Sequence, residues 1–376
     1  MDFTYSTEQE QLREAFARWL EHEYDFAARR AIIHGAGVSD AAWQGLSELG
    51  LLALAVPEEA GGLGGNLFDL GLVMQEAGRA LLIEPYWATI SAAWLLQQAG
   101  GQQAVLQRIA QGEVKCALAW QERAARHDLQ HIACRVDVSD EGFVLDGEKT
   151  VVIHGAQADY LIVSARSNGA PHDEDGVSLF LVPAHTPGLS RREYRTLDGM
   201  RAADILFEQV SLPPSALLGQ AGGGWALLQG GADFARLLLC AEAFGAMRAL
   251  FDATLEYVKT RQQFGAPIGK FQALQHRLAD MYMQLEQAHS IYLLACAQAP
   301  QASGAARARL VSAAKARIGQ AARFIGQQAV QLHGGIGVTD ELQAAHWFKR
   351  LSMIEISLGD TDWHLARFAA SSAQEA

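Results

Sequence analysis

Hydrophobic positions recur with helical spacing through the first 112 residues and again from about residue 219 to the end of the chain. Between residues 113 and 218 the pattern changes to short runs of β-branched and apolar residues, which turn-forming clusters separate. These patterns predict the α+β fold class. An N-terminal α-helical domain (residues 1–112) precedes a middle antiparallel β-domain, a sandwich or barrel (113–218), and a C-terminal four-helix bundle (219–376).

Turn and cap signals divide these regions into predicted elements. Thr7 and Glu10 have the spacing of a capping box, and an amphipathic helix follows them. The bundle is predicted to contain long helices over about 225–260, 271–298, 304–332 and 339–357, and then a short helix that ends near Ala370. Asp146-Gly147 indicates a hairpin turn between strands. Seven strands are predicted in the middle region: Cys116–Trp120, His131–Val136, Phe143–Leu145, Val151–Ile153, Tyr160–Val163, Val177–Val182 and Ile205–Val210.

Composition and charge narrow the functions that this chain can have. Half of its residues are hydrophobic and its formal net charge is −12, so we expect neither nucleic acid nor a membrane as its main partner. No apolar run reaches membrane-spanning length, and the acidic, amphipathic start resembles neither a signal nor a transit peptide. A cytoplasmic location is therefore predicted. The cysteines have no metal-ligand spacing and are expected to be reduced core thiols: Cys116, Cys134, Cys240 and Cys296.

The most distinctive segment is Arg261–Met281, where one predicted helix ends and the next begins. Gly265 and Pro267 interrupt the helical pattern, and one interpretation is simply the turn of a helical hairpin. An arginine and an amide directly before this turn also suit a pyrophosphate, which binds bidentate donors near helix ends. The pattern alone leaves both interpretations open.

A second segment with glycines at a helix end is Gln331–Gly337. Its adjacent glycines, Gly334 and Gly335, are typical of a helix C-cap, and this is the simpler interpretation. No Gly-x-Gly-x-x-Gly follows a strand into a helix, so a Rossmann nicotinamide site is not expected. A zinc site is not expected either, because these histidines lack ligand spacing: His154, His276 and His333.

The run Arg261-Gln-Gln-Phe-Gly-Ala-Pro-Ile-Gly-Lys-Phe-Gln, together with Gln331-Leu-His-Gly-Gly, resembles the acyl-CoA dehydrogenase family. The order of α-domain, β-domain and α-bundle is also that of the family. The resemblance implies an enzyme that binds FAD and introduces an α,β-double bond into an acyl-CoA thioester. It also implies cofactor contacts: Arg261 and Gln263 at the pyrophosphate, Phe264 packed against the dinucleotide, Gln331, Gly334 and Gly335 at the phosphate-adenosine half, and Thr361 at the flavin, where a helix N-cap is the alternative.

The segments that hold the isoalloxazine ring in the family are altered in this chain. The family usually has a Thr-Glu-Pro segment where this chain has Ala119-Trp-Gln-Glu122. Val151 and Ile153 stand where the family has a flavin-stacking tryptophan and a hydroxyl donor. Backbone N–H groups can still bond the ring. The resemblance does not, however, imply that this chain alone holds it.

The catalytic base of the family is a carboxylate, and neither of its two usual positions has one here. The matching residues are Gly359 and Ala235. Glu242 lies in the middle of a long apolar helix, where a carboxylate is costly unless it is paired or functional. It is the predicted base, and the alternative is a structural ion pair with Arg236 or Arg248.

The surroundings of Glu242 predict where an acyl group would bind. The face downstream of this carboxylate carries only small residues, which would leave room for a ligand. Substrate contacts are therefore predicted for Arg236, Leu238 and Gly245. Asp360, one residue from the family's usual position, is the second candidate for the base.

Two further segments, Cys240–Met247 and Leu358–His364, resemble the bacterial branch that degrades sterol and bile-acid side chains. The resemblance implies a steroid side-chain CoA ester as substrate and an electron-transfer flavoprotein or similar acceptor. It also implies a homo-oligomer or an α2β2 heterotetramer with a paralogous subunit. Two alternatives stay open: a flavin-poor companion subunit that completes a partner's flavin site, and a related flavin oxidase or monooxygenase acting on a non-CoA substrate.

Overall fold

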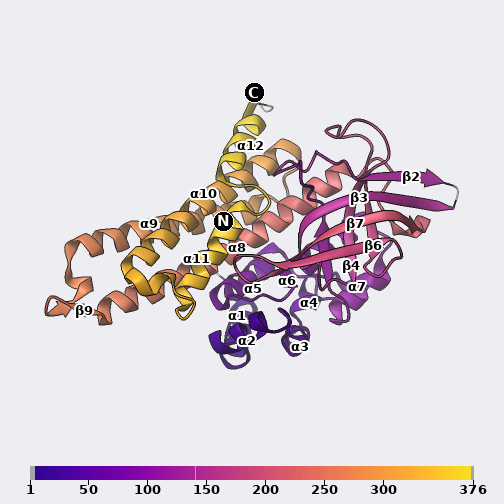
Figure 1. Cartoon of the computed structure of the whole chain (residues 1–376). Coiled ribbons are helices and arrows are strands. Elements are labelled where there is room, and N and C mark those ends of the chain that lie inside the picture. The colour runs from indigo at the N-terminus through magenta and orange to yellow at the C-terminus, as the bar shows by residue number, and fades with distance from the viewer. Residues whose placement is uncertain (1–4, 140, 374–376) are drawn as a thin grey trace. The chain divides into compact units, whose positions relative to one another are not determined.

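The computed structural model describes residues 5–139 and 141–373. Helices α1–α7 come first, then strands β1–β8, and then helices α8–α12 (Figure 1), which confirms the predicted α+β class and its order of regions. The chain packs into two compact units, and the predicted three-domain boundaries stay a prediction. The helical unit comprises the residues up to Arg30, Leu67–Leu82 and those from Arg236 onward; the sheet unit comprises Ala31–Asn66 and Ile83–Ala235.

The helical unit is built on long helices. α8 (Trp225–Thr260) enters this unit at Arg236, and α9 (Gln272–Gln298) and α10 (Gly304–His333) lie side by side (Figure 1). These three helices match their predicted ranges within a few residues. The fourth, α11 (Gln343–Ile356), starts later than predicted, because a 3-10 turn and a short loop follow α10. The other helices that lie wholly in this unit are α1 (Thr7–Glu23), α5 (Leu67–Ala80) and α12 (Thr361–Ala373).

Two glycines let α5 and α8 touch backbone to backbone within the helical unit. A Cβ added to Gly78 would lie 2.0 Å from the carbonyl oxygen of Glu242. A Cβ added to Gly245 would lie 1.8 Å from the carbonyl oxygen of Gln75. Interiors are close-packed and atoms do not approach so closely, so neither position accepts a larger residue. The small residues near Glu242 therefore serve a helix crossing.

The cap of the first helix differs from the prediction by one residue. Ser6, rather than Thr7, is the N-cap of α1, and its hydroxyl oxygen accepts a hydrogen bond from the Gln9 N–H at 3.2 Å. The Gln9 side chain in turn accepts from the Ser6 N–H at 3.0 Å. This is a capping box with glutamine in the last position. Both residue pairs have the same spacing, so the local pattern could not separate them.

The sheet unit contains one sheet in the order β6-β7-β3-β2-β4-β5-β8, with β1 beside β4. Most neighbouring strands are antiparallel, as predicted, but β1 and β2 both run parallel to β4. The strand bounds are β1 (Cys116–Ala119), β2 (Arg135–Ser139), β3 (Gly142–Ile153), β4 (Tyr160–Arg166), β5 (Val177–Pro183), β6 (Leu189–Arg195), β7 (Arg201–Leu212) and β8 (Leu217–Leu218).

Two strands differ from the sequence prediction. The register between β3 and β7 shifts between Leu145 and Gly147, and Gly147 has φ +143°. The Asp146-Gly147 pair is therefore a β-bulge inside one long strand, and the hairpin turn predicted there is wrong. The pattern also missed β6, because this edge strand is mostly polar and largely exposed, with no apolar run to reveal it.

The remaining helices pack mainly in the sheet unit. The four cysteines are all buried, and each is a free thiol rather than part of a disulfide. Burial raises the pKa of Cys134 to about 11 and that of Cys240 to about 12, so these thiols are unreactive at neutral pH. Within the described part of the chain, no helix has the length and apolar character needed to cross a bilayer. The remaining helices are α2 (Phe26–His34), α3 (Asp40–Glu48), α4 (Leu51–Leu54), α6 (Tyr86–Ala99) and α7 (Gln103–Ala110).

Candidate active site

The segment after α8 is a small β-hairpin that exposes an aromatic ring. Gln263 pairs with Ala266 across a two-residue turn, in which Phe264 has φ +53° and Gly265 has φ +77°. Two positive φ angles define the turn types that favour Asn or Gly, so a phenylalanine there costs about 1–3 kcal/mol. Its side chain is nevertheless 91% exposed. A strained, exposed aromatic residue indicates a binding role rather than a folding role.

The polar side chains predicted to bind the cofactor have no hydrogen-bond or ion-pair partners within the described part of this unit. Arg261 and Gln263 are exposed, and within the described residues neither side chain has a hydrogen-bond or ion-pair partner. Gln331 is also exposed and its side chain is likewise unpaired within the described chain. The structure therefore leaves an intact set of donors where the family resemblance places a dinucleotide, and these residues fit its pyrophosphate and adenosine parts.

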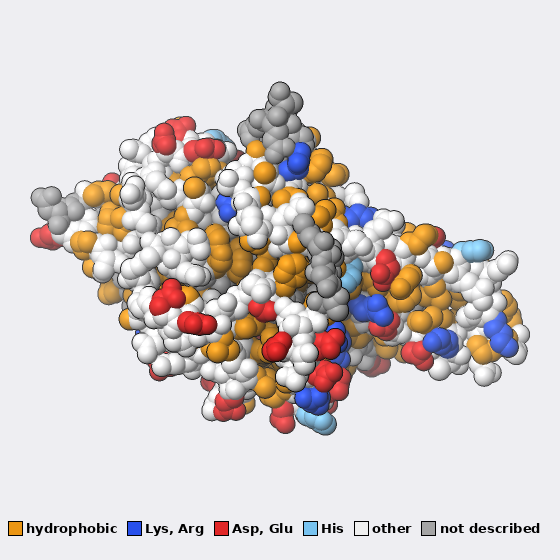
Figure 2. Space-filling model, turned by 180° about the vertical axis from the view of Figure 1, so that it is seen from behind, with side chains coloured by type: hydrophobic (Ala, Val, Ile, Leu, Met, Phe, Trp, Pro, Cys, Tyr) orange, Lys and Arg blue, Asp and Glu red, His pale blue; other side chains and the backbone are white. Residues whose placement is uncertain are grey.

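A contact between two aromatic side chains connects the segment around Arg261 to the segment around Gln331. Tyr257, one helical turn before Arg261, stacks on His333 with ring centroids 4.4 Å apart, and its hydroxyl donates to the His333 carbonyl at 3.3 Å. Gly334 follows with φ +66° and ends α10, as the C-cap interpretation predicted. The helical unit shows hydrophobic and basic side chains together at the right of Figure 2. Exposed apolar residues of this unit include Phe264, Phe271, Ile336 and Val338.

The turn between α11 and α12 lies at the family's usual base position, and it excludes a side chain there. Gly359 has φ +112°, and a Cβ on it would lie 2.5 Å from the Trp363 ring and 2.7 Å from His364 Nε2. The preceding residue, Leu358, also has a positive φ of 56°. Gly359 therefore has no room for the carboxylate side chain that the family usually carries at this position.

Two buried cationic side chains donate hydrogen bonds to the backbone carbonyl groups of this turn. Lys315 Nζ donates to the carbonyl oxygens of Ile354, Glu355 and Gly359 at 2.8, 3.0 and 3.0 Å. Arg236 Nε donates to the Leu358 carbonyl at 2.8 Å. Because carbonyl groups at the end of α11 would otherwise be unsatisfied, the lysine acts as a helix C-cap.

Thr361 and Asp360 have structural partners inside the chain. The Thr361 hydroxyl donates to Glu355 Oε1 at 2.9 Å. Asp360 Oδ1 accepts from the Trp363 N–H at 2.8 Å, so Asp360 is the residue that caps α12, not Thr361. The flavin contact predicted for Thr361 and the second-choice base role of Asp360 stay predictions.

Glu242 forms an ion pair with a residue that the sequence pattern did not indicate. Arg350 on α11 binds it with two parallel hydrogen bonds, Nε to Oε1 at 2.5 Å and Nη2 to Oε2 at 2.7 Å. The side chains are only 7% and 2% exposed, respectively. Arg248 instead pairs with Asp252 at 3.1 Å. Glu242 thus forms an ion pair with Arg350 rather than with Arg236 or Arg248, and its predicted role as the catalytic base stays a prediction.

The predicted space for an acyl group beside Glu242 is filled. α5 occupies it, because Gly245 packs against the backbone of Gln75. Leu238 is fully buried in the core, and the buried Arg236 guanidinium lies over the Trp363 ring, 5.0 Å from its centroid. The expectation of free space at Gly245 is thus wrong. The substrate contacts predicted for Arg236, Leu238 and Gly245 stay predictions.

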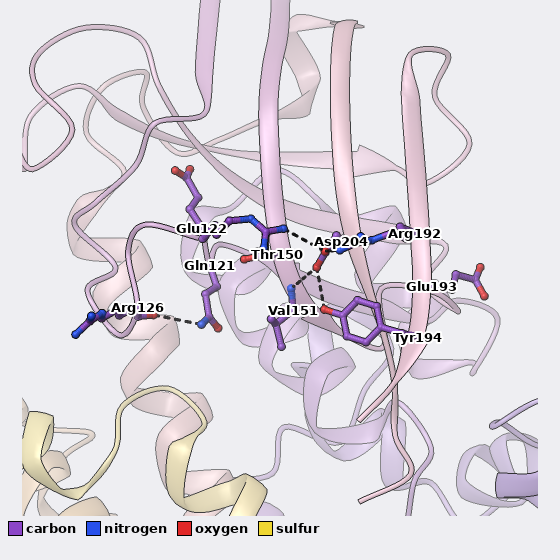
Figure 3. A pocket seen from close by; sticks show the side chains of 10 residues that line it. Gln121, Glu122, Arg126, Thr150, Val151, Arg192, Glu193, Tyr194 and Asp204 are labelled. Atoms are coloured by element: carbon purple, nitrogen blue, oxygen red, sulfur yellow. Dashed lines mark hydrogen bonds and ion pairs between the residues drawn. The ribbon is translucent and has the colours of Figure 1, made fainter. Parts of the chain in front are cut away.

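In the sheet unit, a backbone amide that a flavin ring could use is already bonded. A second bulge in β3 gives Val151 a φ of +52° and leaves it 41% exposed. Its N–H donates to Asp204 Oδ1 at 3.1 Å (Figure 3). Asp204 also accepts from Tyr194 at 2.8 Å and from Arg192 at 2.5 Å. Burial opposes ionisation, but these bonds outweigh it and lower the pKa of Asp204.

The neighbouring segment, where the family has Thr-Glu-Pro, is committed to the fold of the sheet unit. Glu122 is buried, pairs with Lys149 at 2.7 Å and accepts from the N–H groups of Ala133 and Cys134 at 2.7 and 3.0 Å. The Gln121 carbonyl accepts from the Thr150 N–H at 2.8 Å. A pocket of about 630 Å³ lies beside these groups (Figure 3), and its walls include Val151, Tyr194 and Asp204. The Val151 N–H, which lies in the wall of this pocket, is thus already bonded to a carboxylate.

Comparison with known proteins identifies the class. The chain matches the acyl-CoA dehydrogenase N-terminal domain over residues 6–113, the middle domain over 117–210 and the C-terminal domain over 222–373. It therefore belongs to the acyl-CoA dehydrogenase family, whose members are FAD-dependent oxidoreductases.

Individual relatives cover nearly all of the chain. It is 32% identical over 348 residues to acyl-CoA dehydrogenase IpdE2 of Mycobacterium tuberculosis, and this match spans 91% of this chain and 90% of that protein. The FAD complex of PigA superposes with a TM-score of 0.91 at 25% identity and covers 100% of both chains. A variant of the Tcur3481-Tcur3483 steroid acyl-CoA dehydrogenase has a TM-score of 0.89 at 28% identity over 98% of both chains.

The turn at Gly359 gives a first prediction. Gly359→Ala adds a side chain at a positive φ and against Trp363, and we expect the free energy of unfolding to fall by about 2–5 kcal/mol. Thermal or urea unfolding measures the change. Gly335→Ala is the matched control, because a Cβ there meets nothing within 4 Å. Equal stability of both variants would contradict the packing of this turn, and Gly359→Glu is expected to restore no base.

His364 predicts a pH dependence of stability. Burial, then the nearby cations Arg236, Lys315 and Arg367, lower the pKa of this imidazole, so the folded state holds it neutral. The pKa in the unfolded chain is about 6.5, so below that pH only the unfolded state binds this proton. The free energy of unfolding should therefore fall from pH 7 to pH 5, by up to about 1.4 kcal/mol per pH unit from this residue.

Urea unfolding at pH 7, 6 and 5 measures this slope. His364→Gln should flatten it, because glutamine has no proton to gain. His185→Gln, at an exposed position of the sheet unit, is the control and should keep the wild-type slope. The same slope in both variants would show that His364 is not held neutral in the folded state.

Proposed function

We propose that this chain is a subunit of an FAD-dependent acyl-CoA dehydrogenase and completes the flavin site of a neighbouring, paralogous subunit. One contrast carries the proposal. The groups that would reach a neighbour's dinucleotide, Arg261, Gln263 and Phe264, are exposed, and the first two are unpaired within the described residues. The groups that would hold a ring or remove a proton in this chain are bonded internally.

The exposed groups suit a dinucleotide held between subunits. A guanidinium binds a pyrophosphate with two charge-assisted bonds, and an amide adds another donor. Phe264 offers an apolar face, which the turn holds away from the rest of the hairpin. Association with a ligand and a second subunit would bury this ring, which offsets the cost of keeping it in a strained, exposed position.

The internal groups argue that the base comes from the partner. When bound, FAD supplies hydride acceptance from the β-carbon of an acyl-CoA, while a carboxylate must remove the α-proton. Both oxygens of Glu242 accept bonds from Arg350, and Gly359 has no room for a side chain. Val151 N–H is likewise occupied by Asp204. We therefore assign Glu242 to an ion pair and the base to the paralogous subunit.

The assembly, substrate and acceptor that we propose extend this assignment. An α2β2 heterotetramer would bring the Arg261 hairpin to the partner's flavin, and exposed apolar residues on α9 indicate a further contact surface. A steroid side-chain CoA ester is the proposed substrate, which the likeness to a steroid acyl-CoA dehydrogenase supports. An electron-transfer flavoprotein is the proposed acceptor.

Arg261→Ala tests the proposal in the assembly co-purified with its partner. Loss of two charge-assisted bonds should weaken FAD binding by at least about 100-fold, since each is worth about 1.5–3 kcal/mol. Titration of the apo-assembly with FAD, followed by flavin fluorescence, measures the dissociation constant. Arg248→Ala is the matched control, because this arginine is exposed on α8, the helix that precedes Arg261, and within the described residues it pairs with its neighbour Asp252.

Two outcomes would overturn the companion role. One is a chain that is yellow when purified without any partner, with one FAD per chain, and that acyl-CoA bleaches under anaerobic conditions. The other is unchanged FAD affinity in Arg261→Ala. Rapid oxygen consumption without an electron-accepting dye would instead favour an oxidase or monooxygenase.

A further inference from the structure

Two loops at one end of the sheet bring a pair of histidines together. His131 precedes β2, and His172 lies between β4 and β5, 41 positions further along the chain. His131 Nδ1 and His172 Nε2 are 3.1 Å apart, and their rings are tilted by 59°. Neither ring is buried, and the His172 side chain is 64% exposed. Both rings thus lie at least partly at the surface of the sheet unit.

A buried arginine fixes the loops that carry these histidines. Arg166, at the end of β4, is only 4% exposed. Its guanidinium donates to carbonyl oxygens directly beside each histidine: Gln130 at 3.4 Å and Ile132 at 3.3 Å in one loop, and Pro171 at 3.1 Å, Asp173 at 2.6 Å and Asp175 at 2.8 Å in the other. One side chain therefore holds both loops at a set separation, and the imidazole pair is pre-organised by a buried group.

A carboxylate lies behind one of the two rings. Asp128 Oδ2 lies 3.3 Å from His172 Nδ1, on the side of the ring away from the Nε2 that faces His131. A carboxylate behind an imidazole is the arrangement that orients histidines at metal sites and raises their basicity.

We propose that His131 and His172 bind one divalent transition-metal ion through Nδ1 and Nε2, with Asp128 as the outer carboxylate. Metal–nitrogen bonds of about 2.0–2.1 Å from two nitrogens 3.1 Å apart give an angle of about 100° at the metal, close to tetrahedral. In the described chain no group of three or more His, Cys, Asp or Glu side chains could hold a metal. Water completes the coordination of this two-histidine site.

The ligand set selects the kind of ion. Imidazole nitrogens favour Zn²⁺, Ni²⁺ and Cu²⁺, whereas Mg²⁺ and Ca²⁺ prefer oxygen ligands. The loop that carries His172 continues with three carboxylates, Asp173, Glu174 and Asp175, which attract a cation. The residues that line the pocket in Figure 3, among them Tyr194 and Asp204, include neither histidine. The histidine site is therefore distinct from that pocket.

Calorimetric titration of the tag-free full-length protein with Zn²⁺ at pH 7.5 tests the proposal. The wild-type protein should bind one equivalent more tightly than any other. His131→Ala and His172→Ala should each weaken that binding at least about tenfold, and Asp128→Asn should weaken it about 10- to 100-fold. Circular dichroism confirms that each variant is folded. Mg²⁺ should produce no comparable signal.

The control is His185→Ala, since this residue is also an exposed histidine of the sheet unit. It should bind zinc as the wild type does. Equal zinc affinity in the wild type, His131→Ala and His172→Ala would overturn the proposal, as would a wild-type protein that binds no zinc. The readout is binding alone, so it stands or falls independently of any flavin or acyl-CoA.

Discussion

The buried ion pair between Glu242 and Arg350 is the constraint on which the helical unit depends. It joins α8 to α11 through two hydrogen bonds, and both side chains are almost completely shielded from water. Removing one partner of such a pair leaves an uncompensated buried charge, which typically costs about 3–5 kcal/mol. α5 packs against α8 at Gly245 in the same region, so the carboxylate has a structural partner and a close-packed helix crossing beside it.

The need to pair buried polar groups also separates the structural residues of this chain from its candidate ligand-binding residues. Buried polar groups are satisfied inside the protein: Lys315 caps α11, Glu122 binds Lys149, and Asp204 holds the Val151 amide. A reactive site instead needs groups that are free to bind a ligand. Such groups lie at the Arg261 hairpin and at Gln331, where exposure and missing partners coincide within the described residues. That distribution is the basis of the role at a neighbour's flavin that we propose.

Local pattern predicted the long helices, most strands and the motif that defines the family. It could not find partners distant in the chain, since Arg350 lies 108 positions from Glu242 and Asp204 lies 53 from Val151. The edge strand β6 was missed because its exposed residues are polar. The pair of His131 and His172 was missed because the two residues are distant in the chain. Only the fold, in which Arg166 bonds to both loops, brings them together.

Glu242→Gln is the most direct test, because glutamine keeps the shape of the side chain and removes its charge. In the FAD-loaded assembly, anaerobic reduction of the flavin by acyl-CoA and thermal unfolding are measured on the same preparation. If Glu242 serves the ion pair, the variant unfolds at a lower temperature and reduces flavin at a rate within a few-fold of wild type. A variant of unchanged stability that keeps its flavin but is no longer reduced would show that Glu242 is the catalytic base.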